Sequence, residues 1–297
     1  AGLVVWPLGT SPVAVDAAAP ASPVGDPATA DPCSLIPSEP LDRFGDTILE
    51  AESGNFYRCD VVIDSGPDRF TAQVLFVRSA PVLPEGVPED REGIVIVRGT
   101  PVPGECVRTL RPPGGIDVRV IARAVTGPFP DPCAVADVTT ESAFAVLARG
   151  QVPRRTSPFE PGSLATVDAC GLLDTAAVAK VPGLEAATPD PGFAGWDCDW
   201  ENPASGASVV VSYDRNRGTS RDGAKKQIAG HEATSRKDED GNGCDVSVVH
   251  RSYTDRRGYP ASELLTVKVD QAVPVPDPCV LGVEVATVAA ERLPAAP

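Results

Sequence analysis

The sequence predicts an α+β protein made of two tandem similar modules, each an antiparallel sheet with flanking helices and two disulfides. Eight cysteines fall into two groups of four, and the motif Pro-Asp-Pro-Cys that ends at Cys133 recurs at Cys279. Between the cysteines of each group lie alternating apolar runs that are typical of strands. A chain of 297 residues is also long enough for two domains of ordinary size.

The cysteine spacings support an internal duplication. The second cysteine follows the first by 26 residues in one group and 28 in the other, and the third follows the second by 47 and 46. Only the last interval differs clearly, at 27 against 35 residues. We therefore divide the chain into the end of a membrane anchor plus a Pro/Ala-rich linker (1–30), module one (31–150), a connector (151–166) and module two (167–297).

Module one opens with a helix that begins at Ser38, which we expect to act as its cap, with Pro40 in the first turn. A second helix over 137–149 ends the module, and Gly150 is suited to its C-terminal cap. Between them, β-branched content and alternation predict strands at 57–63, 70–78, 93–98, 106–110 and 116–124.

Module two repeats this order. We expect Asp174 to cap a helix that runs to Val181, and a final helix over 283–293. We also expect a helix over 222–232. Strands are predicted at 196–201, 207–213, 244–252 and 264–270.

An even number of cysteines is typical of a disulfide-braced protein from an oxidising compartment. Duplication removes most of the possible pairings, and we expect sequential pairs: Cys33–Cys59, Cys106–Cys133, Cys170–Cys198 and Cys244–Cys279. Zinc is the weaker alternative, because no two cysteines have C-x-x-C spacing and no histidine lies near enough in sequence to complete a compact site.

Composition limits the partners. Asp and Glu outnumber Lys and Arg by 41 to 26, so nucleic acid, which requires a basic surface, is an unlikely partner. The chain contains no Met, and we expect it to derive from a longer precursor. Residues 1–9 are apolar and precede a Pro/Ala/Ser/Thr stretch of little expected order, which predicts the end of a cytoplasmic-membrane anchor; a plain hydrophobic terminus is the alternative.

A basic stretch in module two is the main candidate for a binding site. It comprises Arg215, Arg217, Arg221, Lys225 and Lys226, in a protein of net charge −15. Such a stretch can attract an anionic glycan or an acidic protein face, although a solvated surface is the simpler explanation. Trp196 and Trp200 lie on one face of a predicted strand, and they would line a ligand groove or pack in the core.

Two other chemistries have weaker support. Asp238, Asp240 and Asn242 match the first half of a calcium-binding loop, but Val249 stands where the bidentate Glu is required, and a hairpin turn explains the glycines equally well. The chain contains no recognisable catalytic motif and only two histidines, His231 and His250. We therefore predict a protein that is not an enzyme and needs no cofactor, with a divergent hydrolase as a minor alternative.

The Asp-Pro-Cys-Ser-Leu opening, the Trp-Asp-Cys-Asp-Trp segment around Cys198 and the repeated Pro-Asp-Pro-Cys resemble a family of secreted or lipid-anchored actinobacterial domains of unknown function. The plan is similar to the extracytoplasmic sensor domain of mycobacterial receptor Ser/Thr protein kinases. The resemblance implies a sensor or ligand-binding region outside the cytoplasmic membrane, with a receptor-kinase ectodomain as one form. An envelope scaffold that binds only proteins is the alternative.

Overall fold

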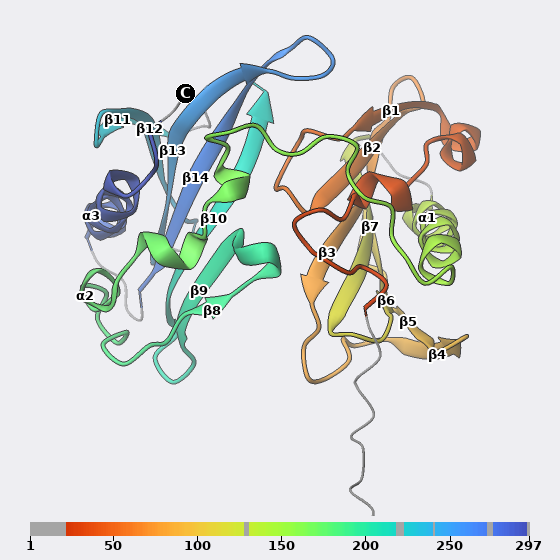
Figure 1. Ribbon diagram of the computed structural model, residues 1–297, viewed down its shortest axis with the longest axis horizontal. Coiled ribbons are helices and arrows are strands. Elements are labelled where there is room, and N and C mark those ends of the chain that lie inside the picture. Colours follow the sequence, from red (N-terminus) through yellow and green to blue (C-terminus); the bar gives the residue numbers. More distant parts are fainter. Residues whose placement is uncertain (1–21, 128–130, 218–222, 240, 272–275, 296–297) are drawn as a thin grey trace, which may run out of the picture.

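The protein consists of two antiparallel sheets of seven strands each (Figure 1). The computed structural model describes residues 22–127, 131–217, 223–239, 241–271 and 276–295. The sheets have the strand orders β1-β2-β3-β7-β6-β5-β4 and β8-β9-β10-β14-β13-β12-β11. These orders are identical when the strands are counted within each module. The expected duplication is therefore confirmed.

Module one contains two 3₁₀ helices, seven strands and one α-helix. Their bounds are η1 Pro32–Leu35, η2 Glu39–Phe44, β1 Asp46–Glu50, β2 Arg58–Asp64, β3 Arg69–Arg78, β4 Val87–Arg91, β5 Ile94–Arg98, β6 Glu105–Arg111, β7 Ile116–Thr126 and α1 Pro132–Leu147.

Module two has the same strand and terminal-helix plan, with additional short helical turns. Its elements are η3 Leu164–Thr166, η4 Ala169–Leu172, α2 Thr175–Val178, β8 Asp190–Pro191, η5 Phe193–Gly195, β9 Asp197–Asn202, β10 Ala207–Arg217, β11 Ala224–Ile228, β12 His231–Lys237, β13 Gly243–Thr254, β14 Pro260–Asp270 and α3 Pro278–Glu291.

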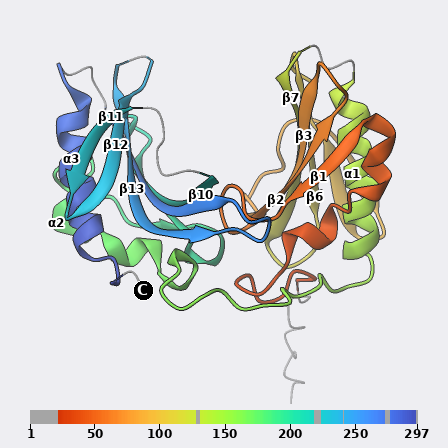
Figure 2. The same ribbon diagram turned by 90° about the horizontal axis from the view of Figure 1, so that it is seen from above.

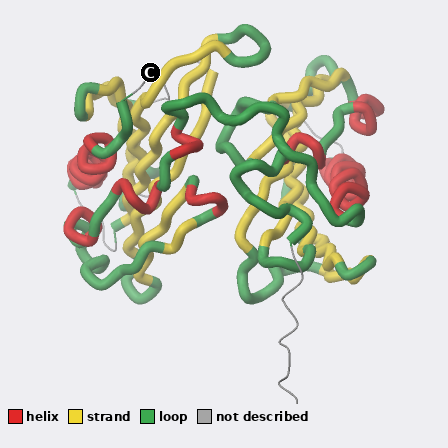
Figure 3. The backbone as a smooth tube through the Cα atoms, in the orientation of Figure 1, coloured by secondary structure: helices red, strands yellow, loops and turns green. Residues whose placement is uncertain are grey.

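Strands dominate both modules, as Figure 3 shows, so the expected α+β class holds only loosely. The helix α1 packs on β6 and β7, and α3 packs on β13 and β14. Figure 2 shows both helices on the outer sides of the two sheets. Alternate side chains of the sheets are buried, as in β10, where every second residue from Ala207 to Arg215 is buried.

The repeated Pro-Asp-Pro-Cys motif is the start of a helix. Asp131 caps α1 by accepting a hydrogen bond from the Ala134 amide (3.0 Å), and Asp277 caps α3 through the Cys279 amide (3.1 Å). The following proline fits the first helical turn. Both helices therefore begin five residues before the predicted starts. By contrast, Ser38 makes no side-chain cap, and the helix that follows it is a short 3₁₀ helix.

The predicted helix over 222–232 is wrong. Residues 224–228 and 231–237 form a hairpin, and its two-residue turn, Ala229-Gly230, has positive φ at both positions (49° and 84°). Tight hairpins require this left-handed turn. Because β12 also pairs with β13, sheet pairing overrides the local helix propensity of Ala, Lys and Gln.

All four expected disulfides are confirmed, and each joins the start of a helical segment to a strand. Closing loops of this length stabilises the fold by about 3.5 kcal/mol per bond in the chain-entropy model. The described part of the N-terminal segment is more ordered than expected. Val24 is fully buried, the Asp31 amide donates to Pro153 O, and Arg154 donates to Val24 O. Residues 22–30 thus pack against the connector.

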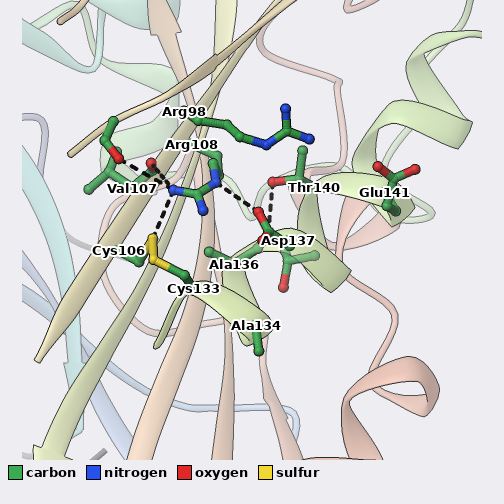
Figure 4. A network of polar contacts seen from close by, with 12 residues as sticks. Arg98, Cys106, Val107, Arg108, Cys133, Ala134, Ala136, Asp137, Thr140 and Glu141 are labelled. Atoms are coloured by element: carbon green, nitrogen blue, oxygen red, sulfur yellow. Dashed lines mark hydrogen bonds and ion pairs between the residues drawn. A yellow bond between two sulfur atoms is a disulfide. The ribbon is translucent and has the colours of Figure 1, made fainter. Parts of the chain in front are cut away.

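The two cores differ at one pair of equivalent positions. In module one, Arg108 lies two residues after Cys106, and its buried guanidinium contacts Asp137 of α1 at 2.8 Å, beside the disulfide (Figure 4). Module two has Val246 and Val283 at the same offsets from its cysteines. A polar pair in one copy is thus replaced by an apolar pair in the other.

Candidate functional site

The two modules meet through equivalent surfaces. The register of β2 with β3 and of β9 with β10 aligns Arg78 with Arg215, because Cys59 pairs Val74 while Cys198 pairs Val211. Arg78 of module one reaches Asp190 and Pro191 O of module two. In return, Arg215 of module two donates to the carbonyls of residues 54 and 55 in module one (3.2 and 3.0 Å). The modules therefore pack as a pseudo-two-fold pair.

Aromatic rings form the centre of this interface. Tyr57 and Trp196 each lie two residues before a cysteine, and their rings stack at 6.3 Å with 9° between their planes. Phe76 stacks on Phe193 at 5.2 Å, and Phe56 contacts Trp196 at 5.5 Å. Because these rings are largely buried, the interface resembles a core rather than a loose contact between domains.

A backbone ladder also crosses the interface. The Gly54 amide donates to Arg215 O at 3.0 Å, and the Arg215 amide donates to Gly54 O at 2.9 Å. The connection between β1 and β2 thus continues the hydrogen-bonding edge of β10. Such reciprocal main-chain pairing fixes the register of one module against the other.

The long β13–β14 hairpin breaks the symmetry. The strand β13 has 12 residues, whereas its equivalent β6 has 7, which accounts for most of the longer last cysteine interval. Near the hairpin tip, Arg257 and Arg217 both contact the largely buried Glu50 carboxylate, and Arg256 contacts Glu52 at 3.3 Å. The extension is therefore fastened to module one by ion pairs.

A cavity of about 560 Å³ lies beside this contact. Its walls come from both modules and from the connector. It is lined by Asp31, Cys33, Leu49, Ala51, Glu52, Phe56, Arg155, Thr156, Ser157, Pro158, Phe159, Glu160, Arg215, Arg251, Tyr253, Thr254, Arg256 and Glu263. The volume is within the range of small-molecule sites, about 300–1,000 Å³.

Two of the four arginines in the cavity are neutralised by acids. Arg251 contacts Glu263 at 2.6 Å, and that carboxylate also accepts hydrogen bonds from the Ser163 hydroxyl and the Leu164 amide. Arg256 is paired with Glu52, as described above. These pairs hold the connector and the hairpin in place. The Glu52 and Glu263 charges also raise the pKa of Arg215, against the larger opposite effect of its burial.

The other two arginines have no such partner. Among the described residues, no carboxylate oxygen lies within 4 Å of Arg155 or Arg215. Burial and the neighbouring Arg215 charge lower the pKa of Arg155 to about 10, and burial lowers the pKa of Arg215. In a partly desolvated site, a nearby like charge disfavours the charged form of an ionisable group.

The structure separates the predicted basic stretch. Arg215 is 6% exposed and lines the cavity, while Arg217 is bound by Glu50 and Asp255. Lys225 and Lys226 are exposed on β11, at the far edge of the sheet from β9. Arg221 lies outside the described residues. Arg215 and Arg217 are thus interface residues rather than members of one basic surface with the lysines.

Both tryptophans are buried, which matches the core alternative. Trp196 is 1% exposed in the interface, and its indole N–H donates to Ala165 O at 2.9 Å. Trp200 is 3% exposed within module two. Neither ring lines the inter-module cavity.

The calcium candidate is a hairpin turn between β12 and β13. The Asp238 amide donates to Gly243 O, and the Asp238 carboxylate contacts the Lys268 ammonium at 3.4 Å. Asp240 lies outside the described residues, and the Asn242 carbonyl accepts a hydrogen bond from the Gln271 amide at 3.1 Å. In the part of the chain that is described, no group of three or more His, Cys, Asp or Glu side chains is arranged to hold a metal.

The histidines are near one another, with ring centroids 6.4 Å apart. Nδ1 of His231 lies 3.0 Å from Val249 O, and Nε2 of His250 lies 2.8 Å from Gly162 O. Both rings therefore face backbone carbonyls through these nitrogens.

Four lining residues, Arg155, Arg251, Tyr253 and Arg256, were missed by sequence reasoning. Arg155 lies in the connector, and the other three lie close together in the hairpin extension, well separated in sequence from both Arg155 and Arg215. The longer last cysteine interval was the one available signal, because it marks the segment that module one does not have.

Four disulfides indicate an oxidising, extracytoplasmic location. None of the helices in the described ranges is both long and apolar enough to cross a membrane. Comparison of the chain with protein-family models, with curated proteins and with solved structures finds no match.

Proposed function

We propose that this chain is the extracytoplasmic ligand-binding region of a membrane-anchored actinobacterial envelope protein, such as a sensor or a receptor-kinase ectodomain, and that the inter-module cavity is its ligand site. The observation that carries this proposal is the pair of arginines in the cavity, the half-buried Arg155 and the buried Arg215, neither of which forms an ion pair within 4 Å with a carboxylate in the described ranges. Buried cations that only stabilise a fold are usually paired with acids.

The architecture supports a sensing role. Residues from module one, the connector and module two all line the cavity, so a bound ligand contacts three segments at once. A ligand that binds the docked arrangement better than a loosened one shifts the balance toward docking. Such a shift, relayed to an anchor at the N-terminal end, would report ligand binding across the membrane.

The test is a thermal-shift screen of the oxidised protein against muropeptides, arabinogalactan fragments, acidic glycans and calcium. A saturable rise in Tm that is lost in Tyr253→Ala, a variant of the cavity wall, supports the function. The matched control is Tyr259→Ala, because Tyr259 is 48% exposed at the hairpin tip and does not line the cavity. The proposed function fails if no compound binds, or if both variants bind as the wild type does.

A scaffold role is the second candidate, and exposed apolar side chains at one edge of module one favour it. Val87 on the edge strand β4 is 70% exposed, and Val82 in the preceding loop is 77% exposed. An unpaired edge strand with apolar side chains can recruit another protein by strand addition. Specific envelope partners in cell crosslinking that disappear in Val87→Lys, together with an empty ligand screen, would favour this role.

A further inference from the structure

We infer that the cavity binds an oxyanion, a carboxylate or a phosphate group of a small ligand, between Arg155 and Arg215. This inference rests on the proposed function and specifies the ligand chemistry of the same site.

Two aromatic rings hold the guanidinium groups. The Arg155 guanidinium carbon lies 4.7 Å from the centroid of the Phe159 ring, and that of Arg215 lies 5.0 Å from the Phe56 ring. The two rings themselves meet edge to face at 5.3 Å. Planar groups held on neighbouring rings lose little conformational freedom when they bind a ligand.

Each guanidinium retains a donor. Arg155 donates through Nη2 to Phe56 O, and Arg215 uses Nε and Nη2 for the carbonyls of residues 54 and 55. Within the described ranges, Nη1 of each arginine makes no hydrogen bond to the protein, and the buried Arg155 Nε and Tyr253 hydroxyl also lack a partner. Oxyanions are suited to such donors, because they accept several charge-assisted hydrogen bonds at once.

Three of the four acids that line the cavity are engaged. Glu52 and Glu263 are paired with Arg256 and Arg251, and the Asp31 carboxylate caps η1 through the Cys33 amide at 3.0 Å. The exposed Glu160 carboxylate makes no ion pair within 4 Å in the described part of the chain. Neither Arg155 nor Arg215 has an ion-pair partner within 4 Å among the described residues, so each can pair with a bound anion.

The duplication supplies an internal comparison. Arg78, at the position in module one that is equivalent to Arg215, forms an ion pair with Asp190 across the interface. In the described part of module one, Arg215 meets backbone carbonyls and the Phe56 ring, with no carboxylate within 4 Å. Thus Arg78 is neutralised by an ion pair, whereas Arg215, at the equivalent position beside the cavity, has no ion pair among the described residues.

Titration calorimetry on the oxidised chain tests the inference with three probes: D-glucuronate, inorganic phosphate and the neutral D-glucose. We expect saturable binding of glucuronate or phosphate, and the stronger of the two identifies the anion. Arg155→Gln should weaken this binding at least tenfold. Arg149→Gln, which removes the same charge from an exposed residue at the end of α1, should leave it unchanged.

Other outcomes overturn the inference in distinguishable ways. Equal binding of glucose and glucuronate would exclude anion recognition but leave a ligand-binding cavity. Failure of both anions at millimolar concentration, or full binding by Arg155→Gln, would exclude the site, while the ligand screen above still tests the function. If Arg155→Gln is misfolded by near-UV circular dichroism, Arg155→Lys and Tyr253→Phe replace it, and wild-type affinity in both would refute the inference.

Discussion

Replacing Glu50 with glutamine should loosen the docking of the two modules without unfolding either of them. The Glu50 side chain is 10% exposed and contacts both Arg217 and Arg257. Those arginines are 36% and 37% exposed, so water partly compensates for the loss of each ion pair. We therefore discount each contact to about 1 kcal/mol, which gives a loss of about 2 kcal/mol in docking free energy.

Hydrogen exchange at two backbone amides measures this loss of docking free energy. The Gly54 and Arg215 amides donate to each other's carbonyls across the interface, so they exchange when the modules separate. A loss of about 2 kcal/mol should accelerate their exchange roughly 30-fold, while amides deep in each sheet keep their rates.

The matched control is Glu89→Gln, which removes an exposed ion pair with Arg98 inside module one. It should leave the Gly54 and Arg215 amides unchanged. Unchanged exchange at these amides in Glu50→Gln, or equal acceleration throughout both sheets, would refute the idea that Glu50 acts on docking.

Three further predictions concern stability. Burial, reinforced by the nearby Asp199 charge, raises the pKa of Asp197 to about 6. The folded state therefore binds a proton that the unfolded state releases, and the free energy of unfolding should fall as pH rises from about 4 to 6. Asp197→Asn should flatten this profile and raise the free energy of unfolding by about 1–2 kcal/mol at pH 7, measured by urea unfolding across pH. Asp137→Val should lower the free energy of unfolding by about 2 kcal/mol because it leaves Arg108 buried without its partner, whereas Arg108→Val should lower it less because Asp137 is half exposed. The double variant should lie within about 1 kcal/mol of the wild type, and additive losses in the double-mutant cycle would contradict the pairing. Removing Cys170–Cys198 by a double serine change should cost about 3.5 kcal/mol in the same assay, and a loss below about 1 kcal/mol would show that the bond braces little.

The duplication and the disulfides could be predicted from the sequence because the cysteine spacing and the Pro-Asp-Pro-Cys motif recur in both halves, although the role of that motif as a helix cap was not predicted. Asp131 and Asp277 precede Pro-Cys, and in both places the carboxylate caps the helix. The class prediction overstated the helices. Alternation in strands such as β10 was visible, but the edge strands β1, β4 and β8 were not predicted.

The hairpin at 224–237 could not be predicted from local propensity, because Lys225 and Lys226 favour a helix on their own. The strand forms since β12 has β13 as a partner, a contact between segments that are separate in sequence. The binding-site prediction met the same difficulty. Charges close in sequence, Arg215 and Lys225, are at opposite parts of the sheet, whereas Arg155 and Arg215 line one cavity.

The most direct test of the account is NMR of the arginine Nε–H resonances during titration of the oxidised protein with glucuronate, repeated with phosphate. The account predicts saturable shifts for Arg155 and Arg215 with at least one anion, while the exposed Arg149 resonance stays in place. Shifts that grow linearly and equally at all three arginines, or no shift at Arg155 and Arg215 with either anion, would contradict an anion site between the modules.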